Sequence, residues 1–150
     1  MSHIFVDADA CPVKQEIYRV AKRYGLRVTL VSNSSMRIAH EAWLTLAVVD
    51  GQFDAVDDWI VEHITENDIV VSGDIRLASR CLAKGAVVLD LRGGGFTEDN
   101  VGEALASLEL LSHLRDLGTV TGGPAPFEGR DRSRFLQRLD ETIQTIRRRR

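Results

Sequence analysis

The stretch Ile4-Phe5-Val6-Asp7-Ala8-Asp9-Ala10-Cys11-Pro12 joins a short apolar run to two acidic residues and a proline. The apolar run predicts a buried strand, and Asp7 and Asp9 follow where that strand ends. Pro12 suits the first turn of a helix, where its missing N–H removes no hydrogen bond. Apolar residues at helical spacing after Pro12, closed by Gly25, predict that helix. The stretch therefore predicts a strand followed by a helix, with two carboxylates at the junction.

Apolar runs and amphipathic segments continue to alternate along the rest of the chain. They predict strands at residues 28–31, 46–49, 68–72 and 86–90, and helices at residues 56–64, 74–84, 97–116 and 134–150. Strands that are apolar throughout and alternate with helices indicate a mainly parallel sheet covered on both faces. The sequence thus predicts an α/β fold: a single three-layer, Rossmann-like domain with helices flanking the sheet. We expect loops at Gly93–Gly95, which should be flexible, and at Thr121–Pro126.

Charge is distributed unevenly along the chain. Residues 130–150 carry eight arginines and three acidic residues, a net charge of +5, so residues 1–129 carry −8 of the total of −3. We expect residues 1–129 to form the body of the domain and residues 130–150 to form a basic helix or tail that packs on it. An acidic body is not a simple nucleic-acid-binding surface, although metal ions can bridge carboxylates to a phosphodiester. The run Arg147–Arg150 is either a solvated helix end or a phosphate contact.

The sequence also indicates a cellular compartment. The chain has two cysteines, Cys11 and Cys81, and they form no CxxC pair. This pattern indicates that the protein has no disulfide framework, which is typical of a reducing compartment. The N-terminus lacks the basic start and apolar stretch of a signal peptide, and no apolar run approaches the ~20 residues that cross a bilayer. We therefore expect a cytoplasmic protein without a membrane partner.

Acidic residues recur where predicted strands end and where one helix begins. In chain order they are Asp7, Asp9, Asp54, Asp57, Asp58, Asp74 and Asp90. Because the carboxyl ends of parallel strands share one edge of a sheet, these carboxylates should lie near one another. Clustered carboxylates repel unless a cation compensates, and Mg²⁺ and Mn²⁺ prefer such oxygen ligands. The pattern predicts a divalent-metal site suited to the attack of water on a phosphodiester.

Several of these acids also have a structural interpretation. Asp54 is suited to cap the helix at residues 56–64, and Asp57 and Asp58 are suited to interact with the dipole of that helix. Asp90 can end a strand without binding anything. These structural roles and the metal-binding role remain open at this point.

Five stretches of the chain together resemble one bacterial family. They are Phe5–Lys14, Asp54–Ile60, Val70–Ala78, Gly123–Phe127 and Arg130–Leu136. The family is the YaiI/YqxD family, also called UPF0178 or DUF188, and the resemblance spans nearly the whole chain. The chain differs from the family pattern at Ser72, Gly73 and Arg76, where threonine, alanine and proline are usual. The resemblance implies a PIN-like fold related to the NYN and PIN nucleases. It implies no known reaction, because the family is essentially uncharacterised.

The resemblance also implies roles for individual acids. In PIN-type enzymes, the acid after the first strand and the acid of a threonine-x-aspartate element bind metal; these positions correspond to Asp7 and Asp74. An acid on an intervening helix joins them, and Asp57 or Asp58 would fill that place. We predict metal ligands among Asp7, Asp57, Asp58 and Asp74, and catalytic residues among Asp7, Asp9, Asp57 and Asp74.

Five further residues are predicted to bind substrate: Asn33, Ser72, Arg130, Arg132 and Arg134. Asn33 lies in a turn cluster after a strand, and Ser72 lies at the same strand end as Asp74. The three arginines are expected just before the last helix. There they either dock on the acidic body through charge-assisted pairs or face a substrate phosphate.

Together these observations predict a Mg²⁺- or Mn²⁺-dependent nuclease that hydrolyses RNA phosphodiesters. One alternative is a haloacid-dehalogenase-type phosphatase, in which Asp7 and Asp9 supply the acids after the first strand. Such an enzyme also needs a lysine and paired acids later in the chain. Lys84 is a helix residue and Asp90 has no acidic neighbour, so neither is a good match. Another is nucleophilic attack by Cys11 at a helix N-terminus. A third is a non-catalytic module that binds RNA or protein. The glycine-rich segment at residues 93–95 is either a mobile linker or a phosphate cradle.

Overall fold

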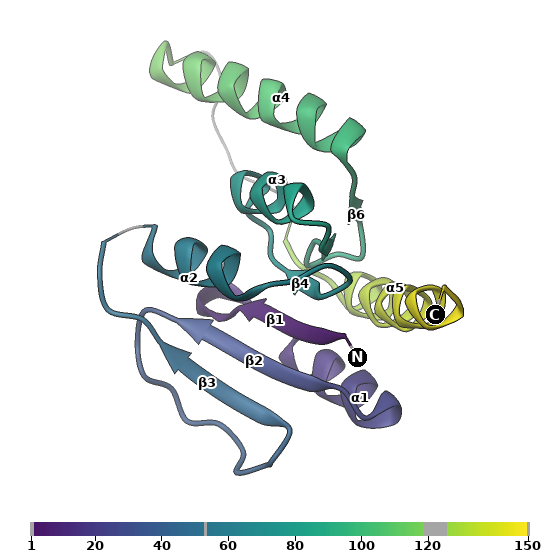
Figure 1. The fold of residues 1–150 in the computed structure, drawn as a ribbon. Helices are drawn as coiled ribbons and strands as arrows, with labels where there is room; N and C mark the ends of the chain where they lie inside the picture. Colours follow the sequence, from purple (N-terminus) through teal and green to yellow (C-terminus); the bar gives the residue numbers. More distant parts are fainter. Residues whose placement is uncertain (1, 53, 119–125, 150) are drawn as a thin grey trace.

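The computed structural model describes residues 2–52, 54–118 and 126–149 of the chain. They form a six-stranded sheet in the order β3-β2-β1-β4-β5-β6 (Figure 1). In chain order the strands are β1 (His3–Asp7), β2 (Arg27–Ser32), β3 (Leu44–Val48), β4 (Ile69–Val71), β5 (Val87–Leu89) and β6 (Gly95–Phe96). Strands β1 to β5 pair in parallel, and β6 pairs antiparallel with β5. The predicted α/β fold with a mainly parallel sheet is confirmed.

The strand order creates a topological switch point between β1 and β4. From β1 the chain moves outward through β2 to β3, and it then returns to form β4 on the other side of β1. Asp7 lies opposite Val31 of β2, and Val6 lies opposite Val71 of β4. In open α/β sheets, ligands bind outside the carboxyl ends of the strands at such a point. Asp7 and the residues that follow β4 therefore flank the expected ligand crevice.

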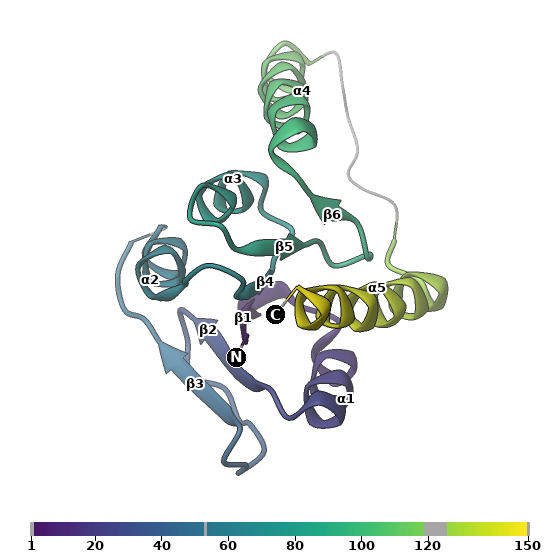
Figure 2. The ribbon, with the colours of Figure 1, turned by 45° about the vertical axis from the view of Figure 1, so that its right-hand side comes forward.

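Helices cover both faces of the sheet, which gives the predicted three layers (Figure 2). They are α1 (Lys14–Tyr24), α2 (Ala55–His63), α3 (Ile75–Ala83), α4 (Glu98–Asp116) and α5 (Gly129–Arg148), with a short 3₁₀ helix, η1 (Ala8–Ala10), after β1. Ile4 and Val6 pack in the core on the α1 and α5 face, whereas Phe5 and Val70 pack on the α2 and α3 face. Helix α4 contacts α3 and lies farther from the sheet (Figure 1). Within the described residues, no helix has the length and apolar character needed to cross a membrane.

Two helix ends form as the local sequence predicts. Gly25 ends α1 in the left-handed conformation, with φ +66°. Thr97 begins α4 with a capping box, in which its hydroxyl accepts a bond from the Asn100 N–H and the Asn100 side chain bonds back to the Thr97 N–H. Both ends were predictable because the groups that satisfy them are close in sequence.

Helix α5 begins at Gly129, earlier than the predicted start at Arg134. The prediction was wrong at this end because residues 130–134 look polar in sequence, whereas Asp131 is only 5% exposed and shares a capping box with Glu128. The next turns of the helix bury four apolar side chains, Phe135, Leu139, Ile143 and Ile146. These residues belong to the core on the α1 face. The predicted loop at Thr121–Pro126, apart from Pro126, and Arg150 of the terminal arginine run lie outside the described residues.

The Gly93–Gly95 segment was expected to be a flexible loop; Gly93 and Gly94 belong to the turn between β5 and β6, and Gly95 begins β6. Asp90 organises this turn, because its Oδ1 accepts hydrogen bonds from the N–H groups of Arg92 and Gly94, each at 2.8 Å. A Cβ on Gly94 would lie 2.6 Å from Asp90 Oδ2. The preceding glycine has φ +89°, and a Cβ there would lie 2.9 Å from the backbone of Arg134. The glycines thus permit close packing, and two of the N–H groups of the turn bind Asp90.

Candidate active site at the carboxyl edge of the sheet

A chain of hydrogen bonds joins Asp7 to Asp74 across the switch point. Asp7 ends β1, and the fully buried Ser72 follows β4 directly. The Ser72 hydroxyl donates to Asp7 Oδ2 at 3.0 Å and accepts a hydrogen bond from the backbone N–H of Asp74, also at 3.0 Å. The two strand ends on either side of the crevice are therefore fixed relative to each other by one buried side chain.

Asp74 is also the N-cap of α3. Its Oδ1 accepts hydrogen bonds from the backbone N–H groups of Arg76 at 2.9 Å and Leu77 at 3.2 Å. Asp54 occupies the corresponding position of α2 and makes no side-chain capping bond there. The prediction that the Asp54 side chain caps α2 is therefore wrong, because the backbone of Asp54 (φ −94°, ψ 5°) does not adopt the extended conformation of an N-cap. A capping bond uses only one carboxylate oxygen, so this role leaves Oδ2 of Asp74 for another ligand.

The structure separates the two neighbouring acids of α2. The half-buried Asp57 is close enough to Asp74 and Asp7 for their charges to raise its pKa. The exposed Asp58 instead pairs with Arg80 of α3, with Nη1 and Oδ1 2.9 Å apart. Asp57 is therefore the helix acid that shares the edge with Asp7 and Asp74, whereas Asp58 already has a cation.

Burial, with repulsion from neighbouring acids, raises the pKa of two of these acids. Burial raises the pKa of Asp57 to about 6, and the charges of Asp74, Asp7 and Asp54 act in the same direction. The pKa of Asp7 is also raised, mainly by burial; the hydrogen bond from Ser72 opposes this rise, and the charges of Asp74 and Asp9 add to it. Asp7 and Asp57 thus lack enough positive charge nearby to balance their ionised forms.

A hollow of about 380 Å³ opens at this edge. Its walls include Asp7 and Asp74, together with Arg76 and Leu91, and Leu108 of α4. Arg76 is exposed, so the hollow combines two carboxylates with a cation that can meet a phosphate. Arg76 was not predicted as a site residue. The available signal was its departure from the family pattern, which has proline at that position.

Asp9 and Asn33 lie at the same edge but make a different contact. Asp9 accepts the hydroxyl of Ser32 on Oδ1 and the backbone N–H of Asn33 on Oδ2, the latter at 3.1 Å. Both carboxylate oxygens of Asp9 therefore fasten the end of β2 to η1. The Asn33 side chain is exposed beside this contact.

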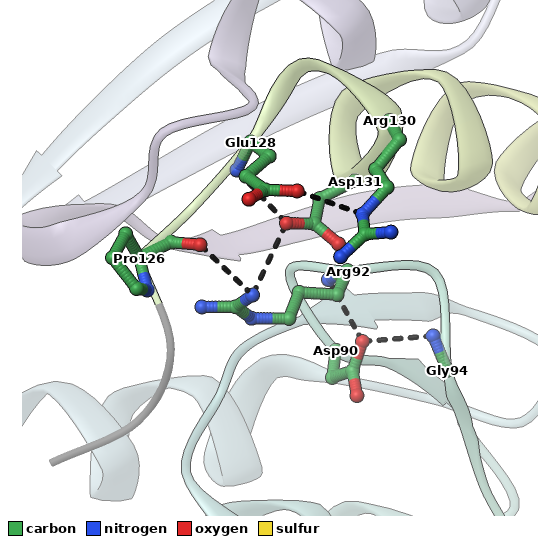
Figure 3. Close-up of polar contacts among 7 residues, drawn as sticks. All are labelled: Asp90, Arg92, Gly94, Pro126, Glu128, Arg130 and Asp131. Carbon is green, nitrogen blue, oxygen red and sulfur yellow. Dashed lines mark hydrogen bonds and ion pairs between the residues drawn. The ribbon is translucent and has the colours of Figure 1, made fainter.

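The first turns of α5 meet the end of β5 close to this edge (Figure 3). Arg92, just after β5, donates from Nη1 to Oδ2 of the buried Asp131 at 3.1 Å and reaches the carbonyl oxygen of Pro126 at 3.5 Å. Arg130 pairs with Glu128 at 2.7 Å and is largely exposed. Arg92 was not predicted as a functional residue, because its partner lies 39 residues away and no local pattern links the two.

Arg132 reaches back to the start of α1. It donates to the carbonyl oxygen of Pro12 at 2.5 Å and lies 3.4 Å from Oε1 of Glu16. Its guanidinium also lies over the ring of Phe127, at 5.1 Å from the centroid. Arg132 thus docks on the body, which is one of the two roles expected of these arginines. Arg134 is exposed on the next turn of α5, not just before the helix.

The donors at this edge suit a partly hydrated metal ion. Among the described residues, no three histidine, cysteine or acidic side chains are grouped closely enough to enclose a metal ion. Mg²⁺ does not require such a cage, because it is usually bound through one or two carboxylates and keeps several waters. Asp7 and Asp57 are carboxylates whose ionised forms are disfavoured by their surroundings, and a divalent cation would relieve this. The residues present therefore fit Mg²⁺ or Mn²⁺.

The structure offers little to the other enzyme mechanisms. Burial raises the pKa of Cys11 to about 11, so its nucleophilic thiolate form is scarce at neutral pH. Lys84 caps the far end of α3 from Asp74 and donates to the carbonyl oxygen of Val61. Asp90 accepts bonds from the β5–β6 turn. The lysine and acid of the phosphatase alternative are thus used elsewhere.

Fold and site together define a class of protein. It is a doubly wound, three-layer α/β domain with carboxylates gathered at the topological switch point of its sheet. The family model described as "Uncharacterized BCR, YaiI/YqxD family" matches residues 5–145. The chain belongs to the YaiI/YqxD family, as its motifs predicted.

Curated relatives match the chain along nearly its whole length. A UPF0178 protein of Rhodospirillum centenum is 53% identical over 152 residues, which cover 99% of each chain. UPF0178 proteins of Paramagnetospirillum magneticum and Rhodospirillum rubrum are each 48% identical, over 99% and 97% of this chain and 98% and 97% of their own lengths. No solved structure matches the chain.

Proposed function

We propose that this protein is a metal-dependent nuclease of PIN-like type that hydrolyses phosphodiester bonds in RNA. The observation that carries the proposal is the hydrogen-bonded chain from Asp7 through Ser72 to Asp74, which spans the switch point beside the carboxylate of Asp57. The three acids come from β1, α2 and the start of α3. Their convergence is a property of the fold, because they are distant in sequence.

Asp7, Asp57 and Asp74 are the residues that would hold the metal, one or two of them directly and the remainder through its bound waters. When bound, Mg²⁺ or Mn²⁺ supplies an activated water and stabilises charge on the phosphate. Asp58 is left out of this set because Arg80 already neutralises it. Arg76 lies in the wall of the hollow and would contact a phosphate oxygen of the substrate.

Two residues have positioning roles in this proposal. Ser72 is fully buried, so it acts by orienting the Asp7 carboxylate through its hydroxyl and not by touching substrate. Asp9 holds Asn33 and the end of β2 against η1, which fixes the position of the β2 end at the carboxyl edge of the sheet. Neither the Cys11 thiol nor the Asp9 carboxylate is free to attack a phosphate, so water is the simplest nucleophile.

The substrate class rests on the PIN-type resemblance and on charge. The body is acidic, so a polyanion would approach the edge through metal bridges and through the arginines near it. Arg76 is such a residue, because it is exposed and lies in the wall of the hollow with Asp7 and Asp74. Arg92 and Arg132 already bond to Asp131 and to Pro12 and Glu16, so they are not counted among these arginines.

The test is cleavage of end-labelled single-stranded RNA in Mn²⁺, with a phosphomonoester assayed in parallel. Wild-type protein should cut the RNA, and chelation or the Asp57→Asn substitution should abolish cutting. Asp58→Asn is the matched control and should retain activity, because its carboxylate faces Arg80 and not the hollow. Turnover of the monoester alone, with phosphate trapped on an aspartate, would instead support the phosphatase. Loss of cutting in Asp58→Asn but not in Asp57→Asn would contradict the proposed site.

A further inference from the structure

A second hollow, of about 300 Å³, lies between α1 and the connection from β2 to β3, and none of the carboxylates of the candidate site lines it. Lys14, Tyr18 and Lys22 form its α1 wall, and the opposite wall consists of Met36–Ala39, Glu41 and Trp43. The connection at residues 33–43 contains no helix, although it joins two parallel strands. Crossovers of that kind usually contain a helix, so here an extended segment leaves the side of α1 open.

Aromatic rings supply one surface of this hollow. Trp43 meets Tyr18 edge to face, with ring centroids 5.7 Å apart and planes at 68°. Both rings are half-buried and pack against the core, so their orientation is held by neighbours. An indole ring fixed at the wall of a hollow is a platform on which a flat aromatic ligand can stack.

The charge of the hollow is opposite to that of the carboxylate edge. Lys14, Lys22 and Arg37 line it with three positive charges, and Glu41 supplies one negative charge. The ammonium of Lys22 lies 5.5 Å from the centroid of Trp43, so cation and ring are presented together. On a body that is acidic overall, this is a local site for an anion that carries an aromatic group.

The hollow is connected to the candidate active site through Asp9. Lys14 begins α1 shortly after η1, and Asn33 begins the connection that supplies the opposite wall from Met36 onward. Asp9, on η1, accepts the N–H of Asn33 and so holds the start of this connection beside the segment that leads into α1. Both walls therefore originate at the carboxyl edge of the sheet. A chain of nucleotides bound at that edge can continue along α1 into the hollow.

We infer that the hollow between α1 and residues 33–43 binds one nucleotide of single-stranded RNA, next to the phosphate held at the carboxylates. The base stacks on Trp43, and Lys14, Lys22 and Arg37 contact the flanking phosphates. This inference rests on the proposed function for the choice of RNA. The site itself does not involve metal, and its binding is measurable without catalysis. Stacking is tolerant of base identity, so the site favours single strands over duplexes without reading sequence.

The test is RNA binding followed by tryptophan fluorescence in the presence of a chelator. The chain has two tryptophans, so the Trp59→Phe substitution leaves Trp43 as the only fluorescent indole. Phenylalanine keeps an aromatic ring at residue 59, where Trp59 stacks on His63 with ring centroids 3.7 Å apart. A short single-stranded oligonucleotide should quench Trp43, and a duplex of the same sequence should quench it far less. In the same chelator, binding followed by the anisotropy of a labelled oligonucleotide should weaken about 5- to 150-fold on Trp43→Leu.

Charge variants separate this site from general attraction. Lys22→Gln should reduce the slope of log Kd against log salt by about 0.7. Arg19→Gln is the matched control, since Arg19 is an exposed cation of the same helix that does not line the hollow, and it should leave the slope unchanged. Equal effects of the two variants, or unchanged binding in Trp43→Leu, would overturn the inference. Quenching without any cleavage in Mn²⁺ would support this binding site while contradicting the proposed nuclease.

Discussion

Replacing Asp57 by asparagine should stabilise the metal-free protein at neutral pH. The substitution keeps the size of the side chain and removes a carboxylate that burial and neighbouring acids disfavour. Asp58→Asn provides the control. Both residues lie in the first turn of α2, so both substitutions lose a similar interaction with the helix dipole. The difference between the two variants therefore reports the destabilisation of Asp57 together with the exposed Asp58–Arg80 ion pair lost in the control, which is worth at most about 1 kcal/mol.

The magnitude follows from the pKa of Asp57, which rises from 3.8 to about 6. Each pKa unit corresponds to about 1.4 kcal/mol, so the full shift sets an upper limit of about 3 kcal/mol. Solvent screening of this half-buried group reduces the expected effect to about 1 kcal/mol. Because the folded state holds this proton more tightly than the unfolded state, the contribution of Asp57 to wild-type stability falls between about pH 4 and 6 and stays lower above pH 6.

Thermal unfolding from pH 3.5 to 8 in a chelating buffer measures the effect. At pH 7.5, Asp57→Asn should melt about 2–4 °C above wild type, since about 1 kcal/mol produces a shift of this size in a protein of this length. Below pH 4 the difference should vanish, because Asp57 is then neutral. Asp58→Asn should show no such gain. A gain that persists at pH 3.5, or that appears equally in Asp58→Asn, would refute the electrostatic explanation.

Four other outcomes are expected. Asp74→Ala should lose about 1 kcal/mol relative to Asp74→Asn in urea unfolding, because only asparagine retains the N-cap of α3. Phe135→Ala should lower the free energy of unfolding by about 3–5 kcal/mol, since this fully buried ring belongs to the core on the α1 face. Asp131→Ala should cost about 2 kcal/mol by removing the buried carboxylate that accepts bonds from Arg92 and from the Glu128 N–H, and a double-mutant cycle with Arg92→Ala should show coupling. Cys11 should react with iodoacetamide much more slowly in the native than in the urea-unfolded protein at pH 8, because its folded pKa is about 11.

Most of the sheet was predictable because its signals are local. The strands β1, β2, β4 and β5 have mainly apolar centres, and turn residues or acids bound them. β3 was harder, since Trp43–Val49 mixes exposed and half-buried positions at the sheet edge, and the strand begins at Leu44, earlier than predicted. β6 was missed, because Gly95–Phe96 has no strand pattern and is held by pairing with β5.

The site was predictable only in outline. Strand ends indicated Asp7, Asp74 and Ser72, but the buried bond from Ser72 to Asp7 connects residues 65 positions apart. Sequence spacing left Asp57 and Asp58 equivalent, and the packing of α2 against α3, which brings Arg80 to Asp58, distinguishes them. The hollow beside Trp43 escaped notice because its two walls come from separate segments.

Calorimetry with Mn²⁺ is the most direct test of the central claim, that Asp7, Asp57 and Asp74 form a divalent-metal site. Wild-type protein and Asp58→Asn should bind Mn²⁺ with similar affinity at pH 7.5. Asp7→Asn and Asp57→Asn should each weaken binding strongly, and Asp74→Asn should do so while its helix cap is retained. Equal Mn²⁺ affinity in wild type, Asp7→Asn and Asp57→Asn would contradict the account.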